Sequence, residues 1–297
     1  MSADLVQLLV ATLTTGTLYA MVAVGVTLIY SATGIINFAQ GEFYMLAGMT
    51  MSATYGSSHW PMPVALALTG LVLVVYAVVL MGASTRLGRG GSLVSVLIIS
   101  IGTSIATSGV ASAIWDADTH RFKPFSGDAP VSVLGATITP QAFWIVGVGT
   151  VSIVVVELVL RRTLVGRAMR AAAMDREAVS LMGVPPWQPV MLAFVIAGLL
   201  SGVGGVVGTP LTTVDYHSGF LLAIKGFSAA MLGGMGQVSG ALAGALLIAG
   251  LESVSVLYGS SQLKELSTFA VVLAVILFMP RGLFGGRHEF GMGHAEH

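Results

Sequence analysis

Long apolar runs, separated by short polar stretches, dominate the pattern of hydrophobic and polar positions along this chain. Runs of about 20 apolar residues are long enough to cross a bilayer as helices. The run at 221–235 is short and glycine-rich, which makes it a candidate half-helix or re-entrant segment. We therefore expect an all-α polytopic membrane protein with about eight or nine transmembrane helices, some of them interrupted. The predicted spans lie at roughly 5–30, 38–56, 62–83, 93–115, 142–160, 189–209, 221–235, 238–257 and 266–280.

The composition agrees with this pattern. Of the 297 residues, 55% are hydrophobic and only 9% are charged, whereas soluble domains carry about 25% charged residues. The apolar runs are continuous rather than alternating, which argues against a membrane β-barrel. The 38 glycines suit close helix packing in lipid. The net charge is zero, so no nucleic-acid partner is implied, and the chain has no cysteine for disulfides or thiol chemistry.

We expect a single transmembrane domain over residues 1–287, which includes a cytoplasmic segment at 161–188, and a disordered tail at 288–297. The pieces between the spans are too short to form a core of their own. The tail holds three irregularly spaced histidines, which we do not assign to a metal. The chain contains none of the GxxxxGK[ST], HExxH or GxSxG motifs, and its carboxylates are scattered. We therefore predict no catalytic residue, no metal and no cofactor.

The basic residues predict the orientation of the chain, because cytoplasmic loops of membrane proteins are enriched in Lys and Arg. Nine of the 13 basic residues lie in three stretches, 86–89, 161–176 and 281–287. If the first two stretches are cytoplasmic, the loop 116–141 between them lies outside, where three Asp residues accompany two basic ones. Counting back from the first stretch places the N-terminus outside as well.

The cytoplasmic segment is the one long charged, helix-prone stretch of the chain. Its alanine-rich first half favours a helix, and Asp175 can act as the N-cap of a second short helix. Glu177 suits the positive end of that second helix, and Gly183, followed by prolines, can close it. We expect two short helices at the membrane surface, with an apolar face made by Met169, Ala172, Val179 and Met182.

Two interpretations of this segment stay open from its pattern alone. It can be a docking knob, in which a face of small residues enters a cleft of a partner and arginines meet acidic groups at the rim. It can equally be an interfacial loop that anchors the adjacent spans. The docking candidates are Gly166, Arg167, Arg170, Asp175, Glu177 and Gly183.

A first polar interruption lies between the first two spans. Asn37 can cap the helix that follows, and Glu42 lies near the start of that helix. Transporters present ligand-binding or gating groups on interrupted helices of this kind. The alternative, which chain physics alone favours, is a tight turn with ordinary capping. The pathway candidates here are Asn37, Gln40, Gly41 and Glu42.

A second interruption lies at 225–236. Lys225 is its only basic residue, and an unpaired charge is expensive inside a membrane. Lys225 must therefore reach an interface by snorkelling, which is the commoner arrangement, or line a polar cavity. The glycines that follow provide a surface where another helix can approach closely, and we include Gly233 and Gly234 with Lys225 as pathway candidates. Glu252 can face the bundle interior or its outer end.

Four motifs in order carry a family resemblance over nearly the whole chain. They are GIINFAQGEFYMLAG at 34–48, GRAMRAAAMDREAVSLMGV at 166–184, KGFSAAMLGGMGQVSGALAGALLIAGLE at 225–252 and PRGLFG at 280–285. With these motifs the chain resembles the permease subunits of branched-chain amino-acid ABC importers, of the LivH type. The usual form of the first motif has His where this chain has Gln40, which removes a titratable group from that position.

The resemblance implies the fold of an ABC importer permease and a place in the bacterial cytoplasmic (inner) membrane. It implies three kinds of protein partner: a second homologous permease subunit, cytoplasmic ABC ATPase subunits, and a periplasmic or extracellular substrate-binding protein. It also implies that residues 166–184 couple the permease to the ATPase. Similar permeases are associated with branched-chain amino acids, other amino acids, urea and short amides.

Two other functions compete with an importer permease. A stand-alone channel or facilitator for a small neutral solute such as urea would explain the small neutral residues and the lack of buried acid pairs. A membrane scaffold would need no transport activity. The polar groups of the two interruptions argue against a scaffold, because such groups are expensive inside a membrane.

Overall fold

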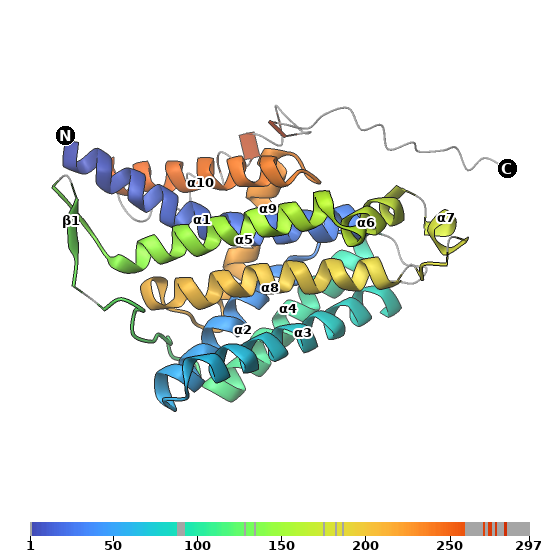
Figure 1. Cartoon of the computed structure of the whole chain (residues 1–297), viewed down its shortest axis with the longest axis horizontal. Coiled ribbons are helices and arrows are strands. Elements are labelled where there is room, and N and C mark those ends of the chain that lie inside the picture. The colour runs from blue at the N-terminus through green and yellow to red at the C-terminus, as the bar shows by residue number, and fades with distance from the viewer. Residues whose placement is uncertain are drawn as a thin grey trace.

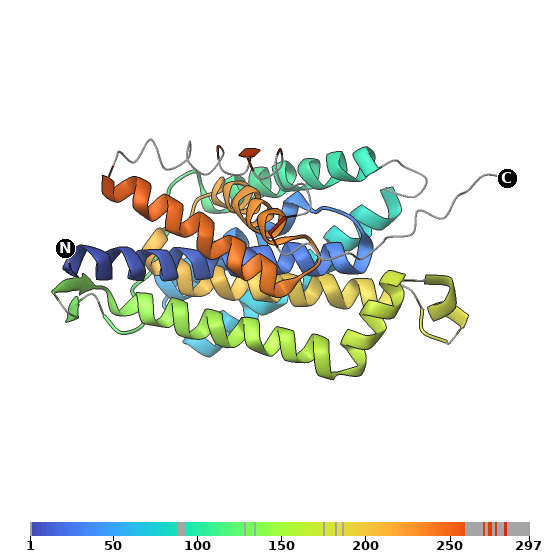
Figure 2. The ribbon, with the colours of Figure 1, turned by 90° about the horizontal axis from the view of Figure 1, so that it is seen from above.

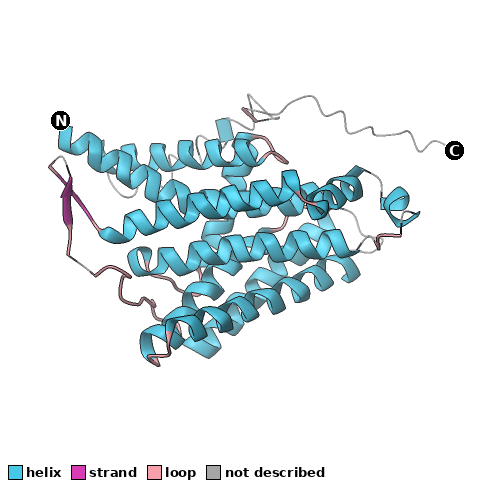
Figure 3. Cartoon of the chain, viewed as in Figure 1, coloured by secondary structure: helices cyan, strands magenta, loops and turns pink. Residues whose placement is uncertain are grey.

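The computed structural model describes residues 2–87, 93–127, 129–133, 135–174, 176–181, 183–185 and 187–258, together with 270, 273, 274, 277, 282 and 283. Helices make up nearly all of this structure (Figure 3). Six of the described helices are long and apolar enough to cross a membrane. They are α1 (Ser2–Thr33), α3 (Met62–Leu87), α4 (Leu93–Trp115), α5 (Pro140–Arg162), α8 (Trp187–Thr212) and α10 (Val238–Tyr258).

This finding confirms the polytopic helical fold, and the six long helices coincide with six of the predicted spans. Two further predicted spans, 38–56 and 221–235, form shorter helices. The ninth, 266–280, lies almost entirely outside the described residues, as does the expected tail at 288–297.

α1 and α8 form the core of the bundle. In each of them, 67% of the most apolar stretch is buried within the chain, compared with 17% in α5 and 22% in α4. Small residues make this close packing possible, because helices without bulky side chains can approach each other in lipid. A Cβ on Gly205 of α8 would collide with the backbone carbonyl of Tyr44. Similarly, a Cβ on Gly198 would meet the ring of Phe43.

Two short helices lie within the bundle. α2 (Glu42–Met51) is preceded by a 3-10 turn, Phe38–Gly41, and followed by a π-helical turn, Ser52–Ser57. α9 (Ser218–Gly233) has 16 residues and runs across the direction of the long helices (Figures 1 and 2). At 1.5 Å per residue α9 is about 24 Å long, which is shorter than the ~30 Å hydrocarbon core. The expected half-helix is therefore confirmed, and the second predicted span is a composite helix.

The distribution of charged segments between the two ends of the bundle agrees with the orientation that the basic residues predict. α3 ends on the same side as the charged helices α6 (Leu164–Met174) and α7 (Arg176–Leu181), and the N-terminus lies at the opposite end (Figure 1). A small hairpin, β1 (Val131–Val133) and β2 (Ala136–Ile138), lies beside the start of α1.

This hairpin was missed in the sequence, where only helices were expected. Its strands pair Val131 with Ile138 and Val133 with Ala136, and Gly135 takes a φ of 83° in the turn between them. The alternation of polar and apolar residues on both sides of a glycine is the usual signal for such a hairpin. The hairpin is too short to change the class of the fold.

Candidate functional site

The charged helices α6 and α7 project from one end of the bundle (Figures 1 and 2). Three residues of the predicted apolar face, Met169, Ala172 and Val179, are 4%, 2% and 2% exposed, and the fourth, Met182, lies outside the described residues. It is buried within this chain, and for that reason it is not the face that enters a cleft of a partner. The side of the pair that remains open carries Leu181, which is 88% exposed, and the exposed Arg167.

Gly166 and Arg170 form the corner between α5 and α6. A Cβ on Gly166 would collide with the carbonyl of Leu160, so only glycine allows the two helices to meet this closely. The Arg170 Nη1 donates a hydrogen bond of 2.6 Å to the same carbonyl oxygen. Cationic groups stabilise the free carbonyls at helix C-termini. Arg170 therefore holds the corner together, a role that its sequence pattern did not reveal.

Gly183 ends α7 as expected. Its φ is 82°, the left-handed conformation that glycine adopts without strain. The Gly183 N–H donates to Ser180 O (3.0 Å), and the Val184 N–H donates to Val179 O (3.3 Å). These two bonds form a Schellman motif, which satisfies the last carbonyls of the helix. Asp175 and the side chain of Glu177 lie outside the described part of the structure.

The first interruption contains both the turn and the cap that the sequence suggested. Gly34 has a φ of 72° just after α1, and the Asn37 Oδ1 accepts a hydrogen bond from the Ala39 N–H at 3.0 Å. The chain then enters the bundle instead of remaining at its surface. Asn37 is 3% exposed, and Gln40 and Glu42 are fully buried. An ordinary surface turn does not bury three polar side chains in succession.

Gln40 points toward α8. Its Nε2 donates to Ala197 O at 3.0 Å and to Ser201 Oγ at 2.8 Å. Its Oε1 has no hydrogen-bond partner in the described structure, and the same is true of Asn37 Nδ2 and Glu42 Oε2. Native proteins leave few buried polar groups unpaired. Three of them within six residues therefore mark this segment as a candidate functional site.

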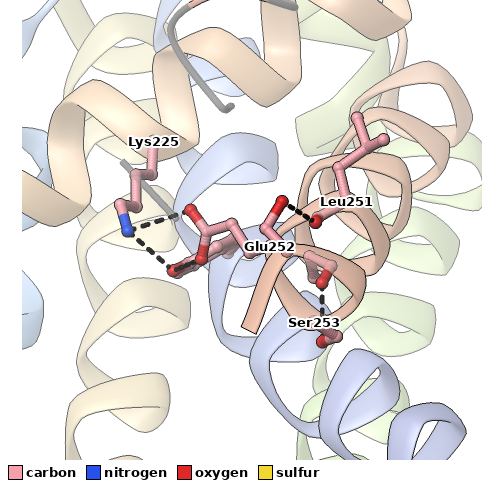
Figure 4. A network of polar contacts seen from close by, with 7 residues as sticks. Lys225, Leu251, Glu252 and Ser253 are labelled. Atoms are coloured by element: carbon pink, nitrogen blue, oxygen red, sulfur yellow. Dashed lines mark hydrogen bonds and ion pairs between the residues drawn. The ribbon is translucent and has the colours of Figure 1, made fainter. Parts of the chain in front are cut away.

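Lys225 belongs to a buried ion pair (Figure 4). Its Nζ lies 3.0 Å from the Glu252 Oε1 and also donates to the Tyr19 hydroxyl at 3.1 Å. The Tyr19 hydroxyl donates in turn to the Glu252 Oε2 at 2.7 Å. The network joins α9, α10 and α1. The expectation that Lys225 snorkels to an interface is wrong, because an acidic partner inside the bundle compensates its charge.

Gly233 and Gly234 end α9 in a close contact with α10. A Cβ on Gly233 would collide with the carbonyl of Gly240, and a Cβ on Gly244 would collide with the carbonyl of Ala229. Gly234 has a φ of 98° and turns the chain toward α10. In this structure, these glycines serve the packing of α9 on α10.

The two interruptions meet each other. A Cβ on Gly41 would collide with the carbonyl oxygen of Gly219 and lie 2.6 Å from the Ala223 N, so the 3-10 turn rests directly on the backbone of α9. The rings of Phe38 and Phe227 pack beside this contact with their centroids 5.2 Å apart. Short helical segments that meet inside a helical bundle, with ionisable residues close by, are typical of membrane transporters.

Comparison with known proteins identifies the family. Residues 8–279 match the family described as the branched-chain amino acid transport system / permease component. The high-affinity branched-chain amino acid transport system permease protein BraD of Pseudomonas aeruginosa is 31% identical over 94% of this chain and 95% of its own length. The corresponding LivH protein of Escherichia coli K12 is 31% identical over 92% of both chains. The fructose import permease protein FruF of Bifidobacterium longum is 26% identical over 88% of this chain and 74% of its own.

The chain therefore belongs to the family of branched-chain amino acid transport permeases, and it is a multi-pass membrane protein. The resemblance that the four motifs indicated is confirmed. Because relatives include a fructose permease by name, membership alone leaves the solute open.

Proposed function

We propose that this chain is a transmembrane permease subunit of an ATP-binding-cassette importer for branched-chain amino acids or related small amino acids and amides. It forms part of the translocation pathway in a bacterial inner membrane, beside a second homologous permease subunit. Cytoplasmic ABC ATPases drive the transport, and a substrate-binding protein delivers the solute from outside. Membership of the permease family supports this proposal.

The exposed tip of the α6–α7 pair is the observation that carries the coupling role. Leu181 is 88% exposed at the end of the bundle that carries the arginines, away from the hairpin end. Burying a leucine side chain contributes about 1.5–3 kcal/mol, so a partner that covers Leu181 gains a large part of its affinity there. Arg167 is exposed on the adjoining helix and can meet acidic groups of that partner.

Purification of the complex in mild detergent tests this proposal. We expect a tagged form of the chain to recover an ABC ATPase and a second permease, identified by mass spectrometry. Recovery of this chain alone as a stable homo-oligomer, together with solute flux in liposomes that contain no ATPase, would favour a stand-alone channel or facilitator.

Variants of the tip test the coupling role more directly. We expect Leu181→Ser or Arg167→Glu to lower the recovered ATPase at least about tenfold, because each change costs about 1.4 kcal/mol or more at the contact. Leu181→Met and Arg167→Lys preserve the apolar contact and the charge, and they serve as matched controls. Arg170 is left unchanged because it holds the α5–α6 corner. Normal recovery and normal uptake with both disruptive variants would exclude this tip as the docking site.

A further inference from the structure

Glu42 is a buried carboxylate that forms no ion pair with a basic side chain in the described part of the chain. It is fully buried at the start of α2. No Lys, Arg or His among the side chains that the structure describes forms an ion pair with it. Glu252 offers the contrast, since Lys225 lies 3.0 Å from that carboxylate. An isolated carboxylate is expensive to bury, so the setting of Glu42 favours a cation or a proton as its partner.

The surroundings of Glu42 are polar on one side. The Ser104 Oγ of α4 donates a hydrogen bond of 2.5 Å to the Glu42 Oε1. Ser108 lies one turn further along α4. The Glu42 Oε2 keeps its capacity to accept, because it has no hydrogen-bond partner in the described structure. One oxygen is therefore held in position, and the other, which packs against Gly219, has no donor in the described structure.

Gly219 leaves no side chain between this carboxylate and the backbone of α9. A Cβ at that position would collide with the Glu42 Oε2. The Glu42 carboxylate and the Ser104 hydroxyl that bonds to it are both groups that can bind an organic ammonium ion.

The site also has a short route to the surface of this chain. Ser104 is 1% exposed, but Ser108 is only half-buried. α4, which carries both residues, has the greater part of its apolar stretch unburied by this chain, so a partner or lipid covers it in the membrane. One helical turn of α4 thus separates Ser104, which bonds to the carboxylate, from the half-buried Ser108.

We propose that Glu42 binds the ammonium group of the amino acid as the solute passes through the permease. The Glu42 Oε2 accepts the hydrogen bond of the ammonium, while Ser104 orients the carboxylate from its other oxygen. This inference rests on the proposed importer function and, among the amino acids and amides proposed there, selects solutes that carry a free amine. Solutes without a cationic group gain nothing from this contact.

Glu42→Gln is the direct test, because the amide keeps the shape of the side chain and removes its charge. The assay uses proteoliposomes with the whole complex, both permeases and the ATPases, supplied with leucine-loaded binding protein. We expect the leucine imported per ATP hydrolysed to fall at least about tenfold, which corresponds to about 1.4 kcal/mol. Asp118→Asn removes an exposed carboxylate outside the bundle and serves as the matched control.

Gly219→Ala provides a second arm if Glu42→Gln fails to assemble. The added methyl group occupies the space against the Glu42 Oε2 and leaves the charge in place. We expect a similar fall in leucine import per ATP, whereas Gly70→Ala, where a Cβ meets nothing within 4 Å, should import like the parent chain.

Four outcomes would overturn the proposal or the function on which it rests. Normal leucine import by assembled Glu42→Gln would mean that the carboxyl carries a proton and serves the fold. If Glu42→Gln does not assemble, normal leucine import by Gly219→Ala would likewise mean that the carboxyl serves the fold. A parent complex that imports only solutes without an ammonium group would refute the solute class and retain the importer. A parent complex that imports nothing would refute the importer function itself.

Discussion

Losing either residue of the buried ion pair between Lys225 and Glu252 should cost the fold more than losing both residues. Their side chains are only 11% and 2% exposed, and the charged atoms lie 3.0 Å apart. Removing one partner of such a pair costs about 3–5 kcal/mol, because the other charge stays buried and loses this ion pair. We therefore expect Lys225→Met and Glu252→Leu each to lower the free energy of unfolding by about that amount.

The double variant should behave differently. With both charges gone, apolar side chains of similar volume fill the space, and such replacements are often neutral or stabilising. The Tyr19 hydroxyl, which bonds to both charged groups, then loses these two hydrogen bonds at a cost of about 1–3 kcal/mol. We expect the double variant to be destabilised by about 1–3 kcal/mol, which is less than either single variant.

A double-mutant cycle in mixed micelles measures these values, with unfolding by a denaturing detergent followed by far-UV circular dichroism. The coupling energy should exceed about 3 kcal/mol, well above the additivity error for independent sites. Lys123→Met, at an exposed position in the outer loop, is the control and should change the free energy of unfolding by less than about 0.5 kcal/mol. Additive effects of the two single variants would refute the argument that the charges stabilise each other.

Two predictions concern glycines. Gly233→Leu places a side chain against the backbone of Gly240, so we expect overpacking to lower the stability by about 1–3 kcal/mol, measured as a lower melting temperature in detergent. Gly82→Ala, with open space around its Cβ, is the control. Equal melting temperatures of the two variants would contradict the packing argument. Gly183→Ala should cost about 1–2 kcal/mol at its φ of 82°. Hydrogen exchange should show faster exchange in α7 and unchanged exchange in α8, and unchanged exchange in α7 would be evidence against the Schellman cap.

The periodicity of the sequence was sufficient to predict the long helices and their local ends. Apolar runs of the right length became helices, because the bilayer core demands internally satisfied backbone groups. Caps depend on neighbours along the chain, and for this reason Asn37 and Gly183 were also predicted correctly.

The contacts between helices were not predictable in the same way. Lys225 and Glu252 were each recognised as unusual, but their pairing depends on how α9 crosses the bundle, which no local pattern encodes. Two opposite charges lie in consecutive spans, where an unpaired charge is expensive, and this was the signal that could have predicted the ion pair. From the sequence, Arg170 was assigned to a partner protein. Its contact with the Leu160 carbonyl forms only where α5 and α6 meet at their corner, and no local pattern encodes that contact.

The contact between Gly41 and Gly219 has a mechanical consequence. Side-chain contacts can absorb small displacements, because rotamers change while backbones stay in place. Here the 3-10 turn rests on the backbone of α9 with no side chain between them, so no rotamer can absorb a shift. A tilt or slide of α9 must either carry Phe38–Gly41 with it or break the contact completely. The two interrupted helices are thus joined as a stiff linkage, in which motion at one end of α9 reaches the buried polar segment undiminished.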